Sequence, residues 1–218
     1  MTTLVIAAHP DDEVLGCGGT MACMAAAGEP VHIAILGEGI TSRHAGRGEA
    51  DSKEIERLHE CSHRAGALVG AASVRNLSLP DNRFDTLPLL EVVKLIEGLI
   101  EELQPQTVFT QHGGDLNIDH VVTFRATLTA TRPMQGRSVR TVYAYEVASS
   151  TEWAFGQFAP RFEPQVFVDI SETLESKIQA MESYESESRS FPHPRSPEAL
   201  RAIATRWGTQ VGMDAAEV

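Results

Sequence analysis

The chain has 218 residues, of which 42% are hydrophobic and 22% are charged. This is the composition of a globular protein, and the length suits one α/β domain with a core of its own. The 18 basic residues against 30 acidic ones give a formal net charge of −12 at pH 7. Such a surface repels phosphate backbones and anionic membranes, which argues against nucleic acids and lipids as partners. No apolar run approaches the roughly 20 residues that cross a bilayer, so we expect no membrane span.

The three cysteines, Cys17, Cys23 and Cys61, lack the spacing of a metal site. The first residues lead directly into an apolar run, without the basic region and cleavage site of an export signal. We therefore expect reduced thiols and a cytoplasmic protein.

Short apolar runs alternate with longer amphipathic stretches along the chain. The runs typical of strands are residues 4–8, 31–36, 74–79, 107–110, 141–145 and 166–170. The stretches typical of helices are residues 13–27, 49–68, 88–103, 121–131, 172–188 and 197–207. This alternation predicts a Rossmann-like three-layer α/β/α sandwich with a mostly parallel sheet that helices cover on both faces.

The chain is expected to form a single domain over residues 1–218. The segment from about 146 to 218 is expected to complete the ligand pocket. The last four residues, 215–218, lie in a helix-forming stretch, so we expect either a short frayed helix or a truncated chain.

Three carboxylates and an imidazole follow the first predicted strand, in the run His9-Pro10-Asp11-Asp12-Glu13. In open α/β sheets, ligands bind beyond the carboxyl ends of the strands, which is where this run lies. Carboxylates this close raise one another's pKa values unless a cation or solvent compensates them, and a divalent metal would do so. His9 and Asp12 could reach one ion from this turn, with Asp11 beside it to handle protons. The alternative is an exposed helix start that Asp11 or Asp12 caps.

The glycines that come next do not complete a nucleotide-binding pattern. Gly16 and Gly18 would need a third glycine at position 21, which is Met21. We expect these glycines to allow close packing of the first helix on a strand instead.

A second polar run, QHGGDLNIDH, occupies residues 111–120 after the fourth predicted strand. Because this is again the carboxyl end of a strand, it can face the first run across the sheet. A metal needs a third protein ligand, and His120 is the candidate, although it could also be an ordinary polar residue at a helix start. Asp119 could hold an imidazole from behind the metal or cap the helix. Asn117 could donate a hydrogen bond to an oxyanion, and Asp115 could bind substrate hydroxyls or brace the loop.

Together, AHPDDEVLGCGG at residues 8–19 and GGDLNIDH at residues 113–120 resemble the LmbE-like (PIG-L) family of zinc-dependent N-deacetylases. The resemblance extends over nearly the whole chain. It implies a Rossmann-like fold and removal of the acetyl group from an N-acetylglucosaminyl-type amino sugar or its conjugate. It also implies one Zn²⁺ per chain, or another divalent transition metal, held by His9, Asp12 and His120, with Asp11 as general base.

One position departs from the family pattern. Many members carry a His three residues before the last metal ligand, as a general acid or oxyanion stabiliser, and this chain has Asn117 there. An amide donates a hydrogen bond but does not release a proton at useful pH. The proton for the leaving amine is then expected from Asp11, or from His112 or His193 if either reaches the site.

Other residues at the same edge of the predicted sheet are candidates for substrate contacts. They follow the second, third and fifth predicted strands, and they are Arg43, Asp81, Arg83, Glu146 and Trp153. Each also has a structural interpretation: a turn, a surface ion pair or aromatic packing.

The leading hypothesis is therefore a metal-dependent N-deacetylase of a small-molecule amino sugar. One alternative is an amidohydrolase of another N-acyl substrate, such as an antibiotic or a thiol-glycoside precursor. A nucleotide-binding or regulatory α/β module and an inactive metal-binding relative are the non-catalytic alternatives. Relatives often assemble, so a homo-oligomer is a further expectation.

Overall fold

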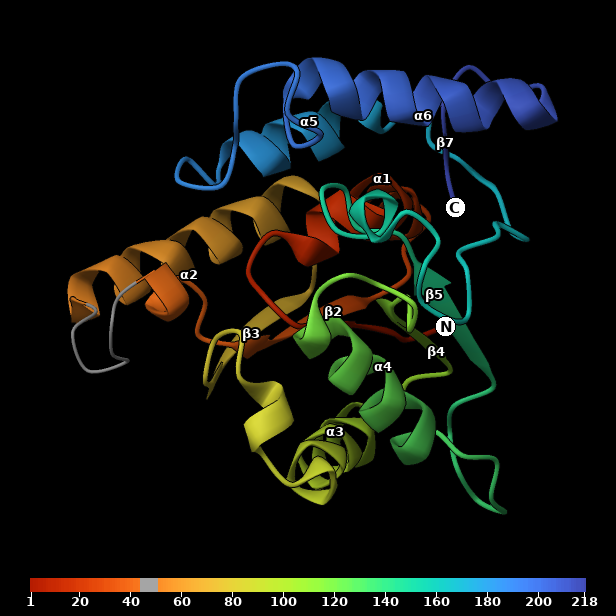
Figure 1. Ribbon diagram of the computed structural model, residues 1–218. Coiled ribbons are helices and arrows are strands. Elements are labelled where there is room, and N and C mark those ends of the chain that lie inside the picture. Colours follow the sequence, from red (N-terminus) through yellow and green to blue (C-terminus); the bar gives the residue numbers. More distant parts are fainter. Residues whose placement is uncertain (44–50) are drawn as a thin grey trace.

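The computed structural model describes residues 1–43 and 51–218, and its centre is a five-stranded parallel sheet (Figure 1). The strands are β1 (Thr3–Ala7), β2 (Val31–Gly37), β3 (Ser73–Leu79), β4 (Thr107–Gln111) and β5 (Thr141–Tyr145), in the order β3-β2-β1-β4-β5. All four strand pairings are parallel. The predicted α/β class and parallel sheet are thus confirmed.

Helices cover both faces of this sheet. They are α1 (Asp12–Ala26), α2 (Ser52–Leu68), α3 (Leu89–Leu103), α4 (Ile118–Ala130), α5 (Leu174–Glu182) and α6 (Pro197–Val211). In Figure 1, α1 and α2 lie on one face of the sheet, and α3 and α4 lie on the other. Helices α5 and α6 lie outside α1 and α2, so the C-terminal part of the chain thickens one side of the sandwich.

Both faces of the sheet are covered because apolar side chains of one strand point alternately to the two faces. In β1 and just beyond it, Val5 and Ala7 pack into the core beneath α1 and α2, whereas Leu4, Ile6 and Ala8 pack into the core beneath α3 and α4. Successive side chains of a strand point to opposite faces, so an uninterrupted apolar run must be covered on both.

The strand order reverses between β1 and β4. From β1 the chain proceeds outward to β2 and β3, and β4 then returns to the other side of β1. Ligands of open α/β sheets bind at such a switch point, beyond the carboxyl ends of the strands. Both polar runs of the sequence begin there, one after β1 and one after β4.

Helix α1 is broken at Cys17, where the backbone has φ −139° and ψ 28°. In a regular helix Gly19 N–H would donate to the Leu15 carbonyl. Here Gly19 N–H donates to the Glu217 carboxylate (2.9 Å), and the Leu15 carbonyl accepts from Lys177 Nζ (2.8 Å). Lys177 and Glu217 also pair with each other at 2.6 Å, so a buried ion pair fills the break.

Two predictions about the C-terminal part need correction. Strand β6 (Val168–Asp169) is shorter than the predicted 166–170 and lies outside the main sheet, where it pairs antiparallel with β7 (Ala216–Glu217). Residues 216–217 therefore form a strand rather than the end of a frayed helix, because the buried Glu217 carboxylate binds the broken helix α1.

The ends of two predicted helices also differ. Helix α5 ends at Glu182 rather than at residue 188, and the chain after it turns toward the pocket, where Glu187 pairs with Arg43. Helix α2 begins at Ser52, and the predicted start at residues 49–50 lies outside the described residues. In the described part of the chain, none of the helices has both the length and the apolarity needed to cross a membrane.

Candidate metal centre and active-site pocket

Two imidazoles and a carboxylate converge at the switch point between β1 and β4. His9 lies between β1 and α1, Asp12 is the first residue of α1, and His120 lies in the first turn of α4. Oδ2 of Asp12 is 3.4 Å from Nδ1 of His9 and 3.2 Å from Nε2 of His120. One ligand atom from each residue lies within 4.8 Å of the other two. The structure thus brings the three predicted metal ligands together.

The second nitrogen of each imidazole faces another buried carboxylate. Nε2 of His9 lies 2.9 Å from Oδ2 of Asp119, and Nδ1 of His120 lies 3.2 Å from Oδ2 of Asp115. Metal-bound histidines typically donate their other N–H to such a carboxylate, which fixes the tautomer and the ring orientation. Each imidazole therefore has one nitrogen oriented by a carboxylate and one directed at Asp12.

The donor set fits a divalent transition metal. Within the described residues, both ring nitrogens of His120 are buried without a well-formed hydrogen bond, which is costly for a polar group that binds nothing. Two neutral imidazoles and one carboxylate are also the ligand types that zinc prefers at catalytic sites. These residues therefore form a His/Asp triad suited to hold a metal ion.

The electrostatics of the triad agree with this interpretation. Burial by itself would lower the pKa of His120, but the charge of Asp12 and the contact with Asp115 raise it to about 9. Burial would raise the pKa of Asp12, whereas His120 and His9 hold it well below its usual value. A buried carboxylate that remains ionised between two imidazoles is a site of high affinity for a positive charge.

A second group of possible ligands shares His9. Oδ1 of Asp81 lies 3.4 Å from Nε2 of His9, on the side of Asp119. These carboxylates already accept backbone hydrogen bonds, Asp81 from Ser42 N (2.9 Å) and Asp119 from Phe84 N (2.9 Å). The second group therefore serves to orient His9 and to tie the loops after β2 and β3 to it.

Asp11 lies beside the triad in a left-handed backbone conformation, with φ 100°. Its carboxylate is buried, and Oδ2 accepts a hydrogen bond from Nη1 of Arg195 at 2.6 Å. Burial raises the pKa of Asp11 well above its usual value, and the positive charge of Arg195 opposes this rise. A carboxyl group with a raised pKa takes up a proton more readily than an ordinary Asp.

The triad opens into a cavity of about 640 Å³. Of the predicted site residues, nine line it: His9, Asp11, Asp12, Arg43, Asp81, Asn117, His120, Trp153 and His193. His193 contacts Trp153 edge to face, with 5.4 Å between the ring centroids. The two residues are brought together at the cavity by the segments after β5 and after α5.

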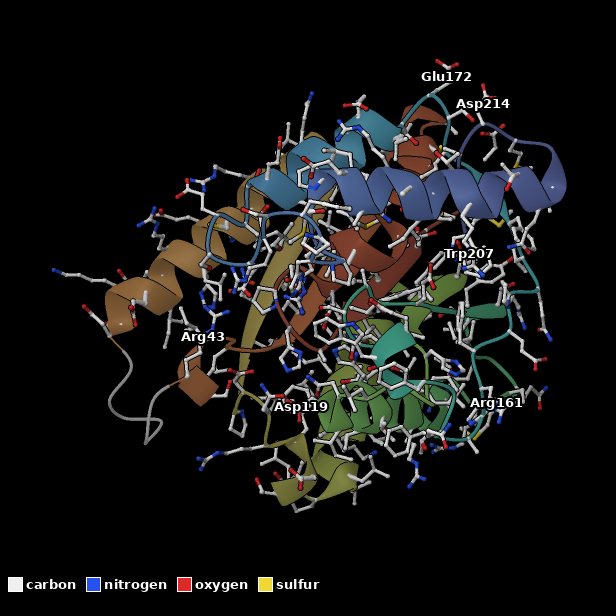
Figure 2. All side chains as sticks on the ribbon, turned by 45° about the horizontal axis from the view of Figure 1, so that its top comes forward. Arg43, Asp119, Arg161, Glu172, Trp207 and Asp214 are labelled. Atoms are coloured by element: carbon white, nitrogen blue, oxygen red, sulfur yellow. The ribbon has the colours of Figure 1, made fainter. Side chains whose placement is uncertain are left out.

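Five predicted residues do not line this cavity, and one of them is Asp119, which lies against Nε2 of His9. Glu146 accepts a hydrogen bond from Trp207, which lies far from Arg43 in Figure 2. Arg83 is exposed on the loop after β3, outside the cavity. Asp115 is buried behind His120, where it accepts hydrogen bonds from the side chains of Ser150 and Thr151 and from a backbone N–H. These contacts make it a loop brace rather than a substrate contact.

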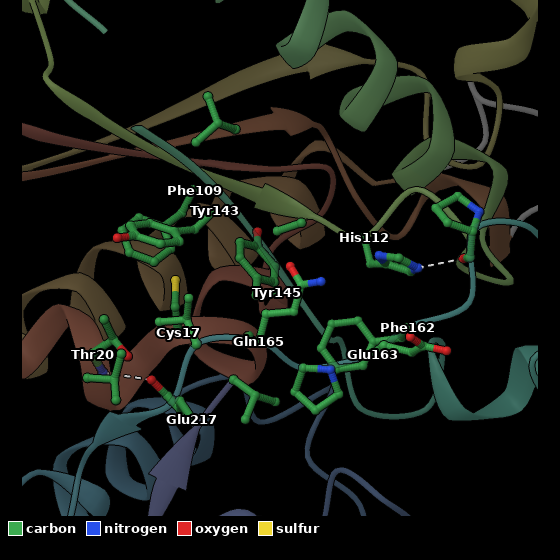
Figure 3. A pocket seen from close by; sticks show the side chains of 18 of the residues that line it. Cys17, Thr20, Phe109, His112, Tyr143, Tyr145, Phe162, Glu163, Gln165 and Glu217 are labelled. Carbon is green, nitrogen blue, oxygen red and sulfur yellow. Dashed lines mark hydrogen bonds between the residues drawn. The ribbon is translucent and has the colours of Figure 1, made fainter. Parts of the chain in front are cut away.

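His112 is the fifth residue, and it belongs to a different cavity. Its Nε2 lies 2.8 Å from the Pro160 carbonyl oxygen, a contact drawn as a dashed line in Figure 3. It lines a cavity of about 560 Å³, bounded mainly by aromatic and apolar side chains such as Phe109 and Tyr143. His112 therefore lines this cavity and not the one into which the triad opens.

Asn117, which the sequence suggests as a donor to an oxyanion, makes two side-chain contacts in the structure. Its Oδ1 accepts from the backbone N–H of Asp119 (2.9 Å), so it is the residue that caps helix α4. Its Nδ2 donates to Oδ1 of Asn82 (3.0 Å). This amide therefore holds two loops of the cavity together.

Sequence reasoning missed three residues that shape the site. Gln111 donates to Oδ2 of Asp12 (2.9 Å), and Arg195 donates to Asp11. Glu187 pairs with Arg43 at 2.6 Å and lies 3.5 Å from Arg195. Of these three, only Gln111 could have been found from the sequence. It ends β4, and every polar residue at that edge of the sheet is a candidate for the site.

Comparison with known proteins agrees with this geometry. The family model described as PIG-L: GlcNAc-PI de-N-acetylase matches residues 4–131, which include the whole triad. The chain is 29% identical over 189 residues to the uncharacterized deacetylase YaiS of Escherichia coli K12, covering 84% of this chain and 90% of that protein. It is 27% identical over 194 residues to a probable N-acetyl-alpha-D-glucosaminyl L-malate deacetylase 2 of Bacillus cereus, covering 86% and 84%.

Among solved structures, the conserved protein TT1542 of Thermus thermophilus superimposes with a TM-score of 0.75 at 26% identity. The match covers 99% of this chain and 91% of that one. The family match spans more than half of the chain and contains the His/Asp triad. The chain therefore belongs to the PIG-L family and is a deacetylase, a hydrolase, of that family.

Proposed function

We propose that this protein is a zinc-dependent N-deacetylase that removes the acetyl group from an N-acetylglucosaminyl-type amino sugar or its conjugate. The observation that carries the proposal is the convergence of His9, Asp12 and His120 with the buried carboxylate of Asp11 at one end of a cavity. The similarity to the probable N-acetyl-alpha-D-glucosaminyl L-malate deacetylase 2 of Bacillus cereus supports the substrate class. We also propose that the whole chain acts as one catalytic unit, because its C-terminal segment contributes His193 and Arg195 to the cavity.

His9, Asp12 and His120 would hold the zinc ion, which when bound polarises a carbonyl and lowers the pKa of water. Asp119 and Asp115 keep the two imidazoles oriented for this role. Within the described residues, Oδ2 of Asp11 is occupied by Arg195, and Oδ1 has no such donor. We assign to Oδ1 the uptake of a proton from the attacking water.

The leaving amine needs a proton, and Asp11 is the group best placed to return the one it took. Asn117 cannot supply it, because an amide does not release a proton at useful pH and this one is engaged with Asn82. Burial, together with the charges of Arg195 and Arg189, lowers the pKa of His193. His193 is therefore neutral at pH 7 and suited to a hydrogen bond with substrate.

The walls of the cavity suit a sugar. Arg43 and Asp81 offer a donor and an acceptor for hydroxyl groups, and Trp153, 41% exposed, offers an aromatic face. Sugars combine polar edges with apolar faces, which matches this division. An amidohydrolase of another N-acyl compound, such as an antibiotic or a thiol-glycoside precursor, would use the same machinery with a different fit at these walls.

Elemental analysis of the purified protein, followed by acetate release from a panel of N-acetylated amino sugars, tests the proposal. We expect close to one zinc per chain and acetate release that a chelator abolishes and zinc restores. A protein that neither contains nor takes up a divalent metal would overturn it in favour of a regulatory α/β module. Metal binding with acyl release only from compounds that lack a sugar would favour the alternative substrate class.

A further inference from the structure

Arg195 makes the one hydrogen bond that the carboxylate of Asp11 receives from the described residues. The two residues are 184 positions apart in sequence, and Nη1 of Arg195 lies 2.6 Å from Oδ2 of Asp11. The Asp11 side chain is buried, and 23% of the Arg195 side chain is exposed. A charge-assisted hydrogen bond of this length is among the stronger and more directional contacts in a protein.

The surroundings of Asp11 would otherwise leave its carboxylate poorly held. Its backbone is in the left-handed region, which Asp tolerates but which local structure must stabilise. Apart from Arg195, the charged groups that act on it most strongly, Asp12, Glu13 and Glu187, are carboxylates that repel it. The direction of the carboxylate is therefore set by a residue from the C-terminal segment and not by its own turn.

Arg195 is itself rigidly placed. Its Nε donates to Oγ of Ser149 (2.7 Å), and its backbone N–H donates to Nδ1 of His193 (3.1 Å). Ser196, the next residue, caps helix α6 through a hydrogen bond from Ala199 N (3.1 Å). Glu187 lies 3.5 Å from the guanidinium on a further side. Because these contacts fix the guanidinium of Arg195, its hydrogen bond restricts the orientation of the Asp11 carboxylate.

We propose that Arg195 is a positioning residue for the reaction: it holds Oδ2 of Asp11 so that Oδ1 is directed at the reacting water. This inference rests on the proposed function, in which Asp11 moves the proton. Arg195 makes no contact with His9, Asp12 or His120 in the hydrogen bonds and ion pairs of the described residues, so its role is separate from metal binding. Misplacement of a reacting group by about 1 Å can cost on the order of 100-fold in rate, which sets the size of the expected effect.

The test compares Arg195→Met and Arg195→Lys with the wild type, in zinc content, thermal unfolding, kcat and KM. For Arg195→Met we expect kcat lower by about 100-fold, with KM and zinc content unchanged. Arg195→Lys, which keeps one donor and the charge, is expected to recover roughly 10-fold of that loss. Arg201→Met is the matched control, because Arg201 of α6 pairs with the exposed Glu175 of α5, neither residue lines the cavity, and the substitution should leave kcat unchanged.

Three results would overturn the proposal: an unchanged kcat in Arg195→Met, a rise in KM without a change in kcat, or a loss of zinc equal to the loss of rate. If Arg195→Met does not fold, Ser149→Ala removes the anchor of Nε and should lower kcat by about 3- to 10-fold, and an unchanged kcat there would also overturn it. Failure of the proposed function appears differently, as a wild type without metal or acetate release. An active wild type that Asp11→Asn inactivates, with Arg195→Met fully active, rejects this inference alone.

Discussion

Oδ2 of Asp115 lies 3.2 Å from Nδ1 of His120, on the side of the ring opposite Asp12. The same carboxylate accepts hydrogen bonds from the hydroxyls of Ser150 and Thr151, which belong to the segment after β5. Burial by itself would raise the pKa of Asp115, but the contact with His120 outweighs it, and the net pKa is below the usual value. Asp115 is therefore ionised at neutral pH. Asp115 therefore connects the ring of His120 to the segment after β5 and restricts the orientation of that ring.

We expect Asp115→Asn to weaken metal binding by about 10- to 100-fold, because the carboxylate behind a metal-bound histidine fixes its tautomer and orientation. Competition with a chelator of known affinity measures the change. Asp85→Asn, at an exposed carboxylate on the loop after β3, is the control. Wild-type affinity in Asp115→Asn would show that His120 does not depend on this support.

Asp11→Asn and His120→Ala are expected to separate proton transfer from metal binding. Asp11→Asn should retain zinc and lose most of the acetate-releasing activity, whereas His120→Ala should lose both, because only His120 belongs to the triad. Zinc per chain and the rate of acetate release are measured on the same preparations. Equal loss of zinc in both variants would contradict this division of roles.

The buried pair of Lys177 and Glu217 should stabilise the fold, because it binds the backbone groups that the break in α1 leaves without helical partners. Each residue is 5% exposed, and Glu217 also accepts backbone hydrogen bonds from Gly19 and Thr20. Lys177→Met leaves the Glu217 charge buried without its partner, and we expect the free energy of unfolding to fall by about 3–5 kcal/mol. Denaturant titration of Lys177→Met, Glu217→Gln and the double variant tests this. Losses that simply add in the double variant would argue against a coupled pair.

Gly16 is expected to be required by packing. A Cβ at this position would overlap the ring of Tyr145, so Gly16→Ala should lower the free energy of unfolding by about 1–3 kcal/mol. Gly98 is the matched control, since it also lies within a helix but faces open space in the described part of the chain. Gly98→Ala should raise stability by roughly 0.5–1 kcal/mol. Similar effects at the two positions would reject the packing argument.

Glu146→Gln should change the pH dependence of stability rather than activity. Burial raises the pKa of Glu146 above 4.5, and the hydrogen bond from Trp207 only partly opposes this. The pKa of Glu146 is higher in the folded state than in the unfolded state. The contribution of Glu146 to the free energy of unfolding is therefore complete below pH 4.5 and is lost as the pH rises through the folded-state pKa. Denaturant titrations from pH 4 to 8 should therefore show the wild type losing stability relative to Glu146→Gln. A constant difference between the two across this range would refute the assignment.

The sequence predicted the central features of the fold and the meeting of the two polar runs for a clear physical reason. Continuous apolar runs predict parallel strands that are buried on both faces. The polar runs that begin at His9 and at Gln111 each lie at the carboxyl end of such a strand. Carboxyl ends of parallel strands lie at one edge, so residues 9–12 and 111–120 had to face each other. The two-residue strand β7 was missed because a pattern this short has no measurable periodicity.

By itself, then, the sequence determined the α/β architecture and the edge of the sheet at which the two polar runs meet, because these follow from local patterns and strand direction. Only the tertiary structure decided which carboxylate supports which imidazole, since His9 meets Asp119 across 110 residues. It also decided that Arg195 contacts Asp11 and that neither Glu146 nor His112 lines the cavity at the triad. Such contacts depend on how the C-terminal segment packs across the sandwich, and packing between distant segments leaves no periodic trace in the sequence.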